Sequence, residues 1–276
     1  MSNEAQVDPH YERGSLVERL KAALIAAGFD ARAPRPEDLE PLDQFHSRGL
    51  DATIELAQAL HLDKATQVLD IGSGLGGPSR YLASHYGSTV RGIDLSPSFV
   101  DAATFLAEKT GLADQVTYQC ANALALPFEA EAFDVAWTQH VAMNIADRSA
   151  LYGEAFRVLR RGGRFAIFDV VSVSDEPLHY PVPWASTPDT SFLVTADQMR
   201  AVLLEQGFSV ESWTDSTAAG IEWFAEVQRK RAQQQAVPAL GLHVVMGPGF
   251  REMAGNLARN LVEGRAGLVQ AILRKA

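Results

Sequence analysis

The stretch VLDIGSGLGGP, residues 68–78, contains a glycine pattern that could bind a cofactor. Its glycines at 72, 74 and 77 match G-x-G-x-x-G, the fingerprint of a loop whose backbone approaches a dinucleotide closely. Asp70 precedes the first of these glycines by two positions. A carboxylate at the mouth of this loop would repel a pyrophosphate, which a helix amino terminus otherwise attracts. The pattern therefore favours a ligand that carries positive charge.

Two further polar residues could recognise an adenosine. Asp94 lies about 20 residues beyond the glycines, the interval at which an acidic side chain reaches ribose hydroxyls. Asn122, in the segment NALALPF, could bond the edge of an adenine together with the backbone of Ala123. S-adenosylmethionine combines an adenosine with a sulfonium and an ammonium, and it lacks phosphate. The glycines alone also leave open an NAD-linked oxidoreductase, which we keep as an alternative.

The elements that position these residues follow from short apolar runs that alternate with helical patterns. Strands are predicted at 67–71, 89–93, 116–120, 133–138 and 164–171. Helices are predicted from Gly77, after Ser96, and over 147–159, where a Gly162-Gly163 stop follows. Such alternation predicts a doubly wound α/β core with a parallel sheet, spanning residues 64–172.

The flanks predict additional helices and two late strands. Before the core, residues 1–63 should form a helical cap, with helices over 15–28, started by a capping box of Ser15 and Glu18, and over 50–60. After it, residues 173–276 contain a helix capped by Thr195 and Gln198, a strand at 208–213, helices at 218–236 and 250–262, and a strand from 267. The late helices interrupt two strands that could pair, so we expect an insertion over the carboxyl edge of the sheet.

Composition restricts the partners and the compartment. A chain of 276 residues can bury one sizeable core, and no run of about 18 apolar residues predicts a membrane span. The net charge of −10 opposes binding to nucleic acid or anionic lipid. The single cysteine, Cys120, cannot form an internal disulfide or by itself a metal site, so no metal is predicted and a cytoplasmic location is favoured. We expect Cys120 to pack in the core.

Five ordered motifs resemble those of a known family. VLDIGSGLGGPSRYLA, VRGIDLS, NALALPF, FDVAWTQHVAMNI and LRRGGRFAIFDVV are similar to the successive motifs of class I S-adenosylmethionine-dependent methyltransferases. The resemblance is to the small-molecule branch, which includes ubiquinone, tocopherol, rebeccamycin-sugar and sarcosine/dimethylglycine methyltransferases. It implies a Rossmann-like seven-stranded sheet with an antiparallel last strand, and helical lid insertions at 173–195 and 218–264.

The resemblance also implies roles for individual residues. It assigns the methionine end of the cofactor to Asp70, Gly72 and Gly74, with Gly76 in the same loop, the ribose and adenine to Asp94 and Leu95, and the adenine edge to Asn122 and Ala123. Gln139 should touch the methionine end or face the acceptor. The family usually has aspartate where this chain has Asn122, so the charge at that position is lost.

Methyl transfer is an in-line displacement that mainly requires an acceptor atom about 3 Å from the methyl group and exclusion of water. A general base is needed only where the acceptor must lose a proton. The candidates are His140, which follows the fourth strand, His46 in a lid, His179, and Asp169 at the end of the fifth strand. We favour His140, because it lies nearest the expected acceptor side. We expect methyl transfer to a small-molecule nitrogen or oxygen acceptor; a cofactor-binding protein without catalytic activity is the second alternative.

Overall fold

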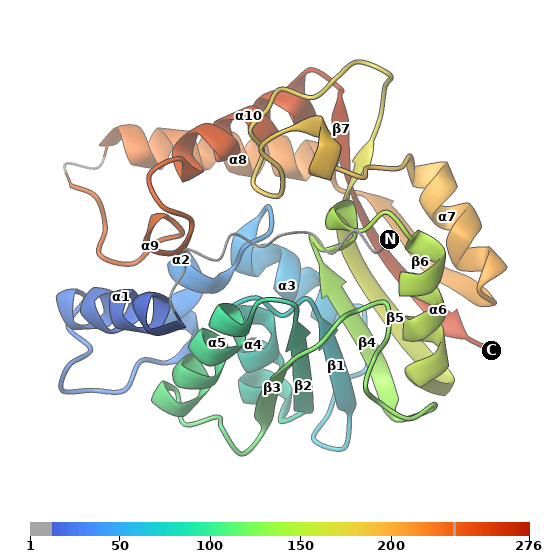
Figure 1. Cartoon of the computed structure of the whole chain (residues 1–276), viewed down its shortest axis with the longest axis horizontal. Coiled ribbons are helices and arrows are strands. Elements are labelled where there is room, and N and C mark those ends of the chain that lie inside the picture. Colours follow the sequence, from blue (N-terminus) through green and yellow to red (C-terminus); the bar gives the residue numbers. More distant parts are fainter. Residues whose placement is uncertain (1–12, 234–235) are drawn as a thin grey trace.

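The computed structural model describes residues 13–233 and 236–276, and their strands form one seven-stranded sheet (Figure 1). The strands are β1 (Gln67–Ile71), β2 (Thr89–Asp94), β3 (Val116–Cys120), β4 (Phe133–Gln139), β5 (Leu159–Ser172), β6 (Phe208–Asp215) and β7 (Ala266–Lys275). Their spatial order is β3-β2-β1-β4-β5-β7-β6, and β7 is antiparallel to both of its neighbours. The predicted fold class is therefore confirmed.

The order of the strands determines where a ligand can bind. From β1 the chain winds outward through β2 and β3, and it then returns to place β4 and β5 on the other side of β1. The crevice outside the carboxyl ends of β1 and β4 is thus the point where the winding reverses, the usual ligand position in such sheets. The glycine loop follows β1 and His140 follows β4, so both lie at this point.

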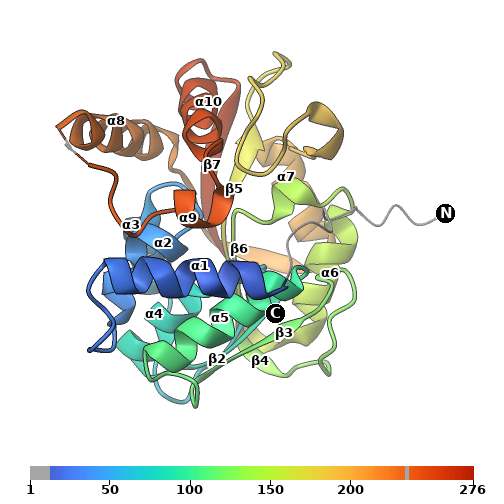
Figure 2. The ribbon, with the colours of Figure 1, turned by 60° about the vertical axis from the view of Figure 1, so that its left-hand side comes forward.

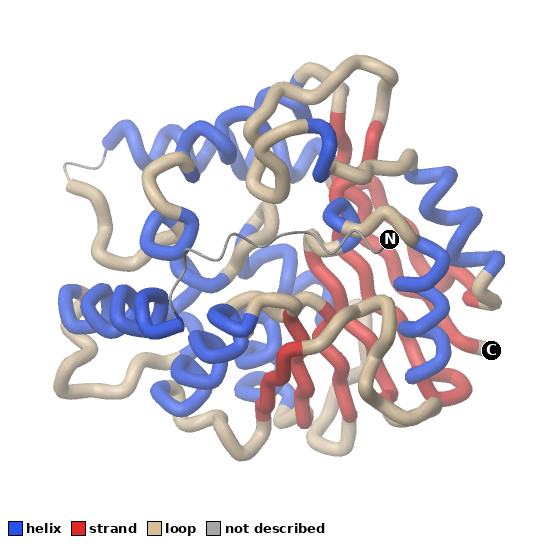
Figure 3. The backbone as a smooth tube through the Cα atoms, in the orientation of Figure 1, coloured by secondary structure: helices blue, strands red, loops and turns tan. Residues whose placement is uncertain are grey.

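Helices cover both faces of the sheet (Figure 3). One apolar core joins the sheet to α3 (Gly49–Gln58), α4 (Gly77–Tyr86), α8 (Thr217–Gln233) and α10 (Phe250–Val262). The other joins it to α6 (Arg148–Val158) and α7 (Ala196–Glu205). Short helical segments are η1 (Pro36–Leu39), α2 (Glu40–Asp43), η2 (Ala142–Asn144), η3 (Pro188–Thr190) and α9 (His243–Met246). The helices α8 and α10 lie beyond the carboxyl edge, where the insertion was predicted (Figure 1).

The amino-terminal segment packs next to the glycine loop. Figure 2 shows α1 (Arg13–Ala26) between α5 (Pro97–Lys109) and α9, and all three helices share one apolar cluster. This cluster includes Leu16 and Leu20 of α1, Leu106 of α5, and Leu75 of the glycine loop. We call residues 36–58, from η1 through α3, the cap segment, because they follow α1 and contact the loop from above the sheet edge.

Most predicted elements are confirmed, and two local predictions are wrong. The side chain of Ser15, which was predicted to cap α1 (Arg13–Ala26), lies outside the described part of the structure. Gly162 and Gly163 do not precede β5 but lie inside it. Leu159 of β5 pairs with Phe133, and the next pair is Arg164 with Val135. The residues of β5 between these two pairs, which include both glycines, therefore form a bulge. Cys120 is exposed, since it ends an edge strand of the sheet.

No helix in the described part of the chain is long and apolar enough to cross a lipid bilayer.

Candidate functional site

The glycine loop is a tight turn that only glycine can make without strain. Gly72, Gly74 and Gly76 have φ angles of +75°, +52° and +74°. A side chain at Gly72 would also overlap the side chain of Val141, while one at Gly74 would stand 3.6 Å from the ring of Phe45, an ordinary contact. Gly72 thus lets the loop after β4 approach the end of β1.

Three successive amides of this loop are directed at the end of β2. The N–H groups of Gly72 and Ser73 both donate to the carbonyl of Ile93 at 2.8 Å. The N–H of Gly74 donates to Oδ2 of Asp94 at 3.0 Å. A loop that holds a phosphate presents free amides to it. These three amides are already paired, so they are not available to a phosphate.

Asp70 supplies a buried carboxylate beside the loop. It is only 2 % exposed, and its Oδ2 accepts a hydrogen bond of 2.5 Å from the hydroxyl of Ser79. Burial raises the pKa of Asp70 to about 7, and the nearby negative charge of Asp94 acts in the same direction. A cationic ligand group would stabilise the ionised carboxylate.

A cavity of about 30 Å³ opens between the loop and the cap segment. Its lining consists of Asp43, Phe45, His46, Asp70, Gly72, Ser73, Gly74, Pro78 and Gln139. Two buried polar atoms of this lining, Oγ of Ser73 and Nε2 of Gln139, have no hydrogen-bond partner among the described residues. Buried polar groups are rarely left unpaired, so unpaired atoms that line a cavity indicate a polar ligand.

Buried side chains of the cap segment form a hydrogen-bonded network with Gln139. The hydroxyl of Thr53 lies 2.9 Å from Oε1 of Gln44, 3.1 Å from Nε2 of His46 and 3.2 Å from Oε1 of Gln139. Nδ1 of His46 lies 3.2 Å from the carbonyl of Ser47. Burial lowers the pKa of His46 to about 4, so the imidazole is neutral at pH 7.

His140 lies at the end of β4 in a strained backbone conformation. Its φ is +54°, which is uncommon for a side-chain-bearing residue, and its N–H donates to the carbonyl of Phe168 at 2.8 Å. Its ring centroid is 6.1 Å from that of His46 and 5.0 Å from that of Phe168. Nε2 of His140 is buried without a partner among the described residues, and burial holds the pKa well below its usual value. The two predicted histidines are therefore brought together, and both are neutral.

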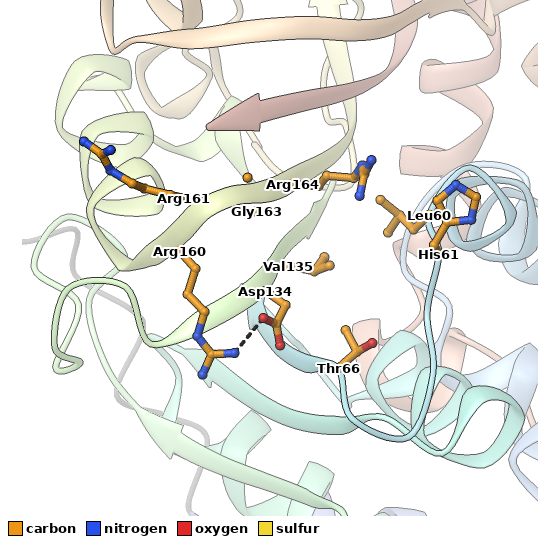
Figure 4. A pocket seen from close by; sticks show the side chains of 10 residues that line it. Leu60, His61, Thr66, Asp134, Val135, Arg160, Arg161, Gly163 and Arg164 are labelled. Atoms are coloured by element: carbon orange, nitrogen blue, oxygen red, sulfur yellow. Dashed lines mark hydrogen bonds and ion pairs between the residues drawn. The ribbon is translucent and has the colours of Figure 1, made fainter. Parts of the chain in front are cut away.

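A larger cavity, of about 190 Å³, lies at the opposite edge of the sheet (Figure 4). Its lining includes Asp134, His61 and three arginines of β5, which are Arg160, Arg161 and Arg164. Arg160 is bound to Asp134 at 2.6 Å, and Arg164 points toward His61 while it pairs with Glu211 at 2.7 Å. Because this cavity lies at the amino ends of β1 and β4 and contains none of the glycine-loop residues, it is separate from the candidate site.

The comparisons with known proteins agree with the site at the carboxyl edge. A family model described as a methyltransferase domain matches residues 69–167. The 27-O-demethylrifamycin SV methyltransferase of Amycolatopsis mediterranei is 31 % identical over 212 residues, which cover 69 % of this chain and 75 % of that protein. The chain belongs to the class I S-adenosylmethionine-dependent methyltransferases. S-adenosylmethionine is the cofactor of this family, so the predicted family is confirmed and the NAD-linked alternative has no support.

Other relatives match over smaller shares of their length. The methyltransferase GfsG of Streptomyces halstedii is 35 % identical over 60 % of this chain and 58 % of its own. Matches with a 24-methylenesterol C-methyltransferase and a tocopherol O-methyltransferase of Oryza sativa cover 50 % and 29 % of those proteins, so the chain spans about half or less of these methyltransferases. A geranyl diphosphate C-methyltransferase from Streptomyces coelicolor has the same fold, with a TM-score of 0.67 at 18 % identity over 82 % of this chain and 77 % of that one.

The residues that the methyltransferase family assigns to adenosine lie along the ends of β2 and β3. Asp94 accepts hydrogen bonds from the N–H groups of Gly74 and Ser96, and Leu95 is 56 % exposed. The segment after β3 is joined to Asp94, because the N–H of Ala121 donates to its carbonyl at 3.0 Å. Asn122 is exposed, and its Oδ1 accepts a hydrogen bond of 2.9 Å from the N–H of Leu124. The side chain of Asn122 therefore stabilises a turn that contains Ala123.

Asp169 is not brought together with the two histidines. Phe168, against which both imidazoles pack, belongs to one face of β5, and side chains alternate along a strand. Asp169 therefore points to the other face, where its two oxygens accept hydrogen bonds of 2.9 Å from the N–H groups of Ala142 and Val170. Burial raises its pKa to about 6.

Sequence reasoning missed several residues that line or support the cavity. Ser73 is part of the glycine loop, but a serine between two glycines carries no signal of its own. Asp43 and Thr53 lie in the cap segment, where the polar run LDQFHSRG before a helix was the available hint. Their partners are distant in the chain, and only the packing of the cap on the loop brings them together.

Proposed function

We propose that this chain transfers a methyl group from S-adenosylmethionine to a small-molecule acceptor with an oxygen or nitrogen nucleophile. The observation that carries the proposal is the group of unpaired polar atoms, Oγ of Ser73, Nε2 of Gln139 and Nε2 of His140, that lies with the Asp70 carboxylate where the winding of the sheet reverses. When bound, the cofactor supplies an activated methyl group. The protein then has to position the acceptor atom against the methyl group, to exclude water and to accept a proton from the acceptor where one is lost.

The cofactor roles rest on charge and position. Asp70 is suited to a cationic group, and the loop of Gly72, Gly74 and Gly76 lets a ligand approach the backbone closely. Asp94 ends β2, where a carboxylate can bond vicinal hydroxyls of a ribose. The exposed side chain of Leu95 offers an apolar surface to an adenine, with Asn122, Ala123 and their backbone at its edge. Gln139 is assigned to the methionine end.

His140 is the best candidate for a general base. Its imidazole is neutral at pH 7 and its Nε2 has no partner among the described residues, so in the tautomer with the proton on Nδ1 it can take the proton of an acceptor hydroxyl during transfer. His46 is less suited, since both of its ring nitrogens have protein partners. Several relatives carry names that denote O-methylation, including those for rifamycin and tocopherol, which favours a hydroxyl acceptor. Asp169 has a supporting role, because it holds the loop after β4.

The cap segment must open to admit the cofactor. A cavity of about 30 Å³ has room for little more than a water molecule or two, far less than a nucleoside. Phe45, which packs over Gly74 and against Phe99, closes the loop from the cap side. Reclosure would exclude water and hold the acceptor in line with the methyl group.

The decisive experiment is transfer of labelled methyl groups to a panel of hydroxyl and amine acceptors by the wild type, His140→Gln and the control His61→Gln. We expect His140→Gln to lose hydroxyl methylation by about 10²-fold or more while it binds S-adenosylhomocysteine normally. His61 is exposed at the opposite edge, so His61→Gln should match the wild type. Normal cofactor binding without transfer to any acceptor would instead support a non-catalytic role or another reaction; a solved neighbour with TM-score 0.67 is described as a [4+2]-cyclase.

We also propose a cytoplasmic location and no binding to nucleic acid. Support comes from the exposed free thiol of Cys120, which suits a reducing compartment, and from the net charge of −10. Cell fractionation and a salt-dependent nucleic-acid binding assay test the two statements separately.

A further inference from the structure

The side-chain amide of Gln139 is fixed in one orientation by its neighbours. The indole N–H of Trp137 donates to Oε1 of Gln139 at 3.0 Å, and the hydroxyl of Thr53 lies 3.2 Å from the same oxygen. An indole nitrogen can only donate, so exchange of the amide oxygen and nitrogen would place two donors against each other. The oxygen therefore faces Trp137 and Thr53, and the NH₂ group is available to the cavity.

This NH₂ group is a donor without a protein partner in a nearly closed site. Gln139 is 9 % exposed, it lines the same cavity as Asp70, and its Nε2 is buried without a hydrogen bond to any described residue. The residues that line the cavity thus include a carboxylate, from Asp70, and a neutral donor, from Gln139. An α-amino acid group, with an ammonium and a carboxylate on adjacent atoms, complements this pair.

Thr53 connects this donor to the cap segment. It is fully buried on α3, and its hydroxyl also lies within hydrogen-bond distance of Gln44 and His46. In the closed cap, the hydroxyl of Thr53 lies 3.2 Å from Oε1 of Gln139 and can donate its single proton to that oxygen, while Gln44 and His46 are its other neighbours. If the cap moved away, Trp137 would be the remaining partner of that oxygen, and the side-chain amide would be less restricted in its orientation.

We propose that Thr53 is a positioning residue that holds Gln139 so that its NH₂ group binds the carboxylate of the cofactor's amino acid end. The inference rests on the proposed use of S-adenosylmethionine and names the chemistry by which the cap recognises it. It makes recognition of the amino acid group dependent on cap closure, because the residue that orients the donor belongs to the cap. Thr53 itself does not touch the ligand.

Calorimetry with two ligands tests this assignment: S-adenosylhomocysteine, and 5′-methylthioadenosine, which lacks the amino acid group. The wild type should bind the first more tightly. Gln139→Met should weaken S-adenosylhomocysteine binding at least about tenfold and Thr53→Val about three- to tenfold, with 5′-methylthioadenosine changed less than about twofold. Thr53→Ser keeps the hydroxyl and should restore the preference.

Thr66→Val is the matched control, since Thr66 is a buried threonine at the opposite edge of the sheet. It should leave both affinities unchanged. An equal loss for the two ligands in Thr53→Val and Gln139→Met, or no loss in either, overturns the assignment. If the wild type binds neither ligand, the proposed function itself fails; if it binds both equally, the roles of Gln139 and Thr53 in recognising the amino acid group fail and the proposed function stands.

Discussion

Nη2 of Arg80 lies 2.6 Å from Oδ2 of Asp43, and the two side chains are 0 % and 1 % exposed. This buried ion pair joins α4, which begins at the glycine loop, to α2 of the cap segment. Nη1 of Arg80 also donates to the carbonyl of Leu75 at 2.6 Å. One guanidinium therefore fixes both the loop and the segment that covers it, although Asp43 and Arg80 are 37 positions apart.

Removal of one partner of this pair should be strongly destabilising. Arg80→Met or Asp43→Asn leaves a buried charge uncompensated, and we expect each to lower the free energy of unfolding by about 3–5 kcal/mol. The double variant Asp43→Leu, Arg80→Met should recover part of the loss, because it removes both charges. Urea unfolding measures all three. A double variant that loses as much as the two single variants together would show that Arg80 acts through Leu75 and not through Asp43.

The affinity for S-adenosylmethionine should depend on the protonation of Asp70. Its pKa of about 7 means that the carboxylate is largely protonated at pH 6 and ionised at pH 8. A cationic ligand prefers the ionised form, so affinity should fall as pH drops below about 7, by at most tenfold per pH unit. Titrations between pH 6 and 8 check this. Asp70→Asn should bind more weakly and show a flat profile; an equally steep profile in that variant would exclude Asp70 as the titrating group.

The same carboxylate should reduce stability at neutral pH. An aspartate titrates near 3.9 in the unfolded chain, whereas Asp70 titrates at about 7 in the folded one. The folded state therefore binds more protons between these values, and the free energy of unfolding falls as pH rises through that window. Asp70→Asn should equal the wild type near pH 4 and exceed it at pH 8. The depressed pKa values of His46 and His140 act in the opposite direction, so the variant and the wild type must be compared at each pH.

Replacement of Asp94 should weaken cofactor binding. Asp94→Ala removes the acceptor of the Gly74 N–H and the carboxylate that we propose to bind ribose hydroxyls, and we expect a loss of about 1–3 kcal/mol in binding free energy. Ser96→Ala is the control, since it removes the cap of α5 and the contact with the hydroxyl of Ser98 but keeps the carboxylate of Asp94. Calorimetry with S-adenosylhomocysteine separates the two. Equal affinities of Asp94→Ala and the wild type would refute the ribose role.

The two glycines at the start of the loop should tolerate alanine differently. Gly72→Ala introduces both a strained φ and an overlap with Val141, whereas Gly74→Ala introduces mainly the strained φ. We expect the first to cost about 1–3 kcal/mol more than the second in thermal or urea unfolding. Adding Val141→Ala to Gly72→Ala should remove the overlap and so recover the stability that the overlap costs. No recovery would mean that the backbone conformation at Gly72 accounts for the whole effect.

The sequence by itself determined the fold class, the family and its cofactor. These features are local: apolar alternation defines each strand, glycines that need positive φ define the loop, and Asp70 and Asp94 stand at fixed intervals from it. The local prediction failed at Gly162 and Gly163, because a bulge can place glycines inside a strand as readily as a turn can place them before one.

Only the tertiary structure decided which polar groups meet. It placed Thr53 of the cap against Gln139 of β4, which are 86 positions apart, and it turned Asp169 away from His140 by one step of strand alternation. It also showed that the amides of Gly72, Ser73 and Gly74 are occupied by Ile93 and Asp94, so these three are not available to a phosphate. Hydrogen bonds over such separations depend on packing geometry, which residue type and spacing do not specify.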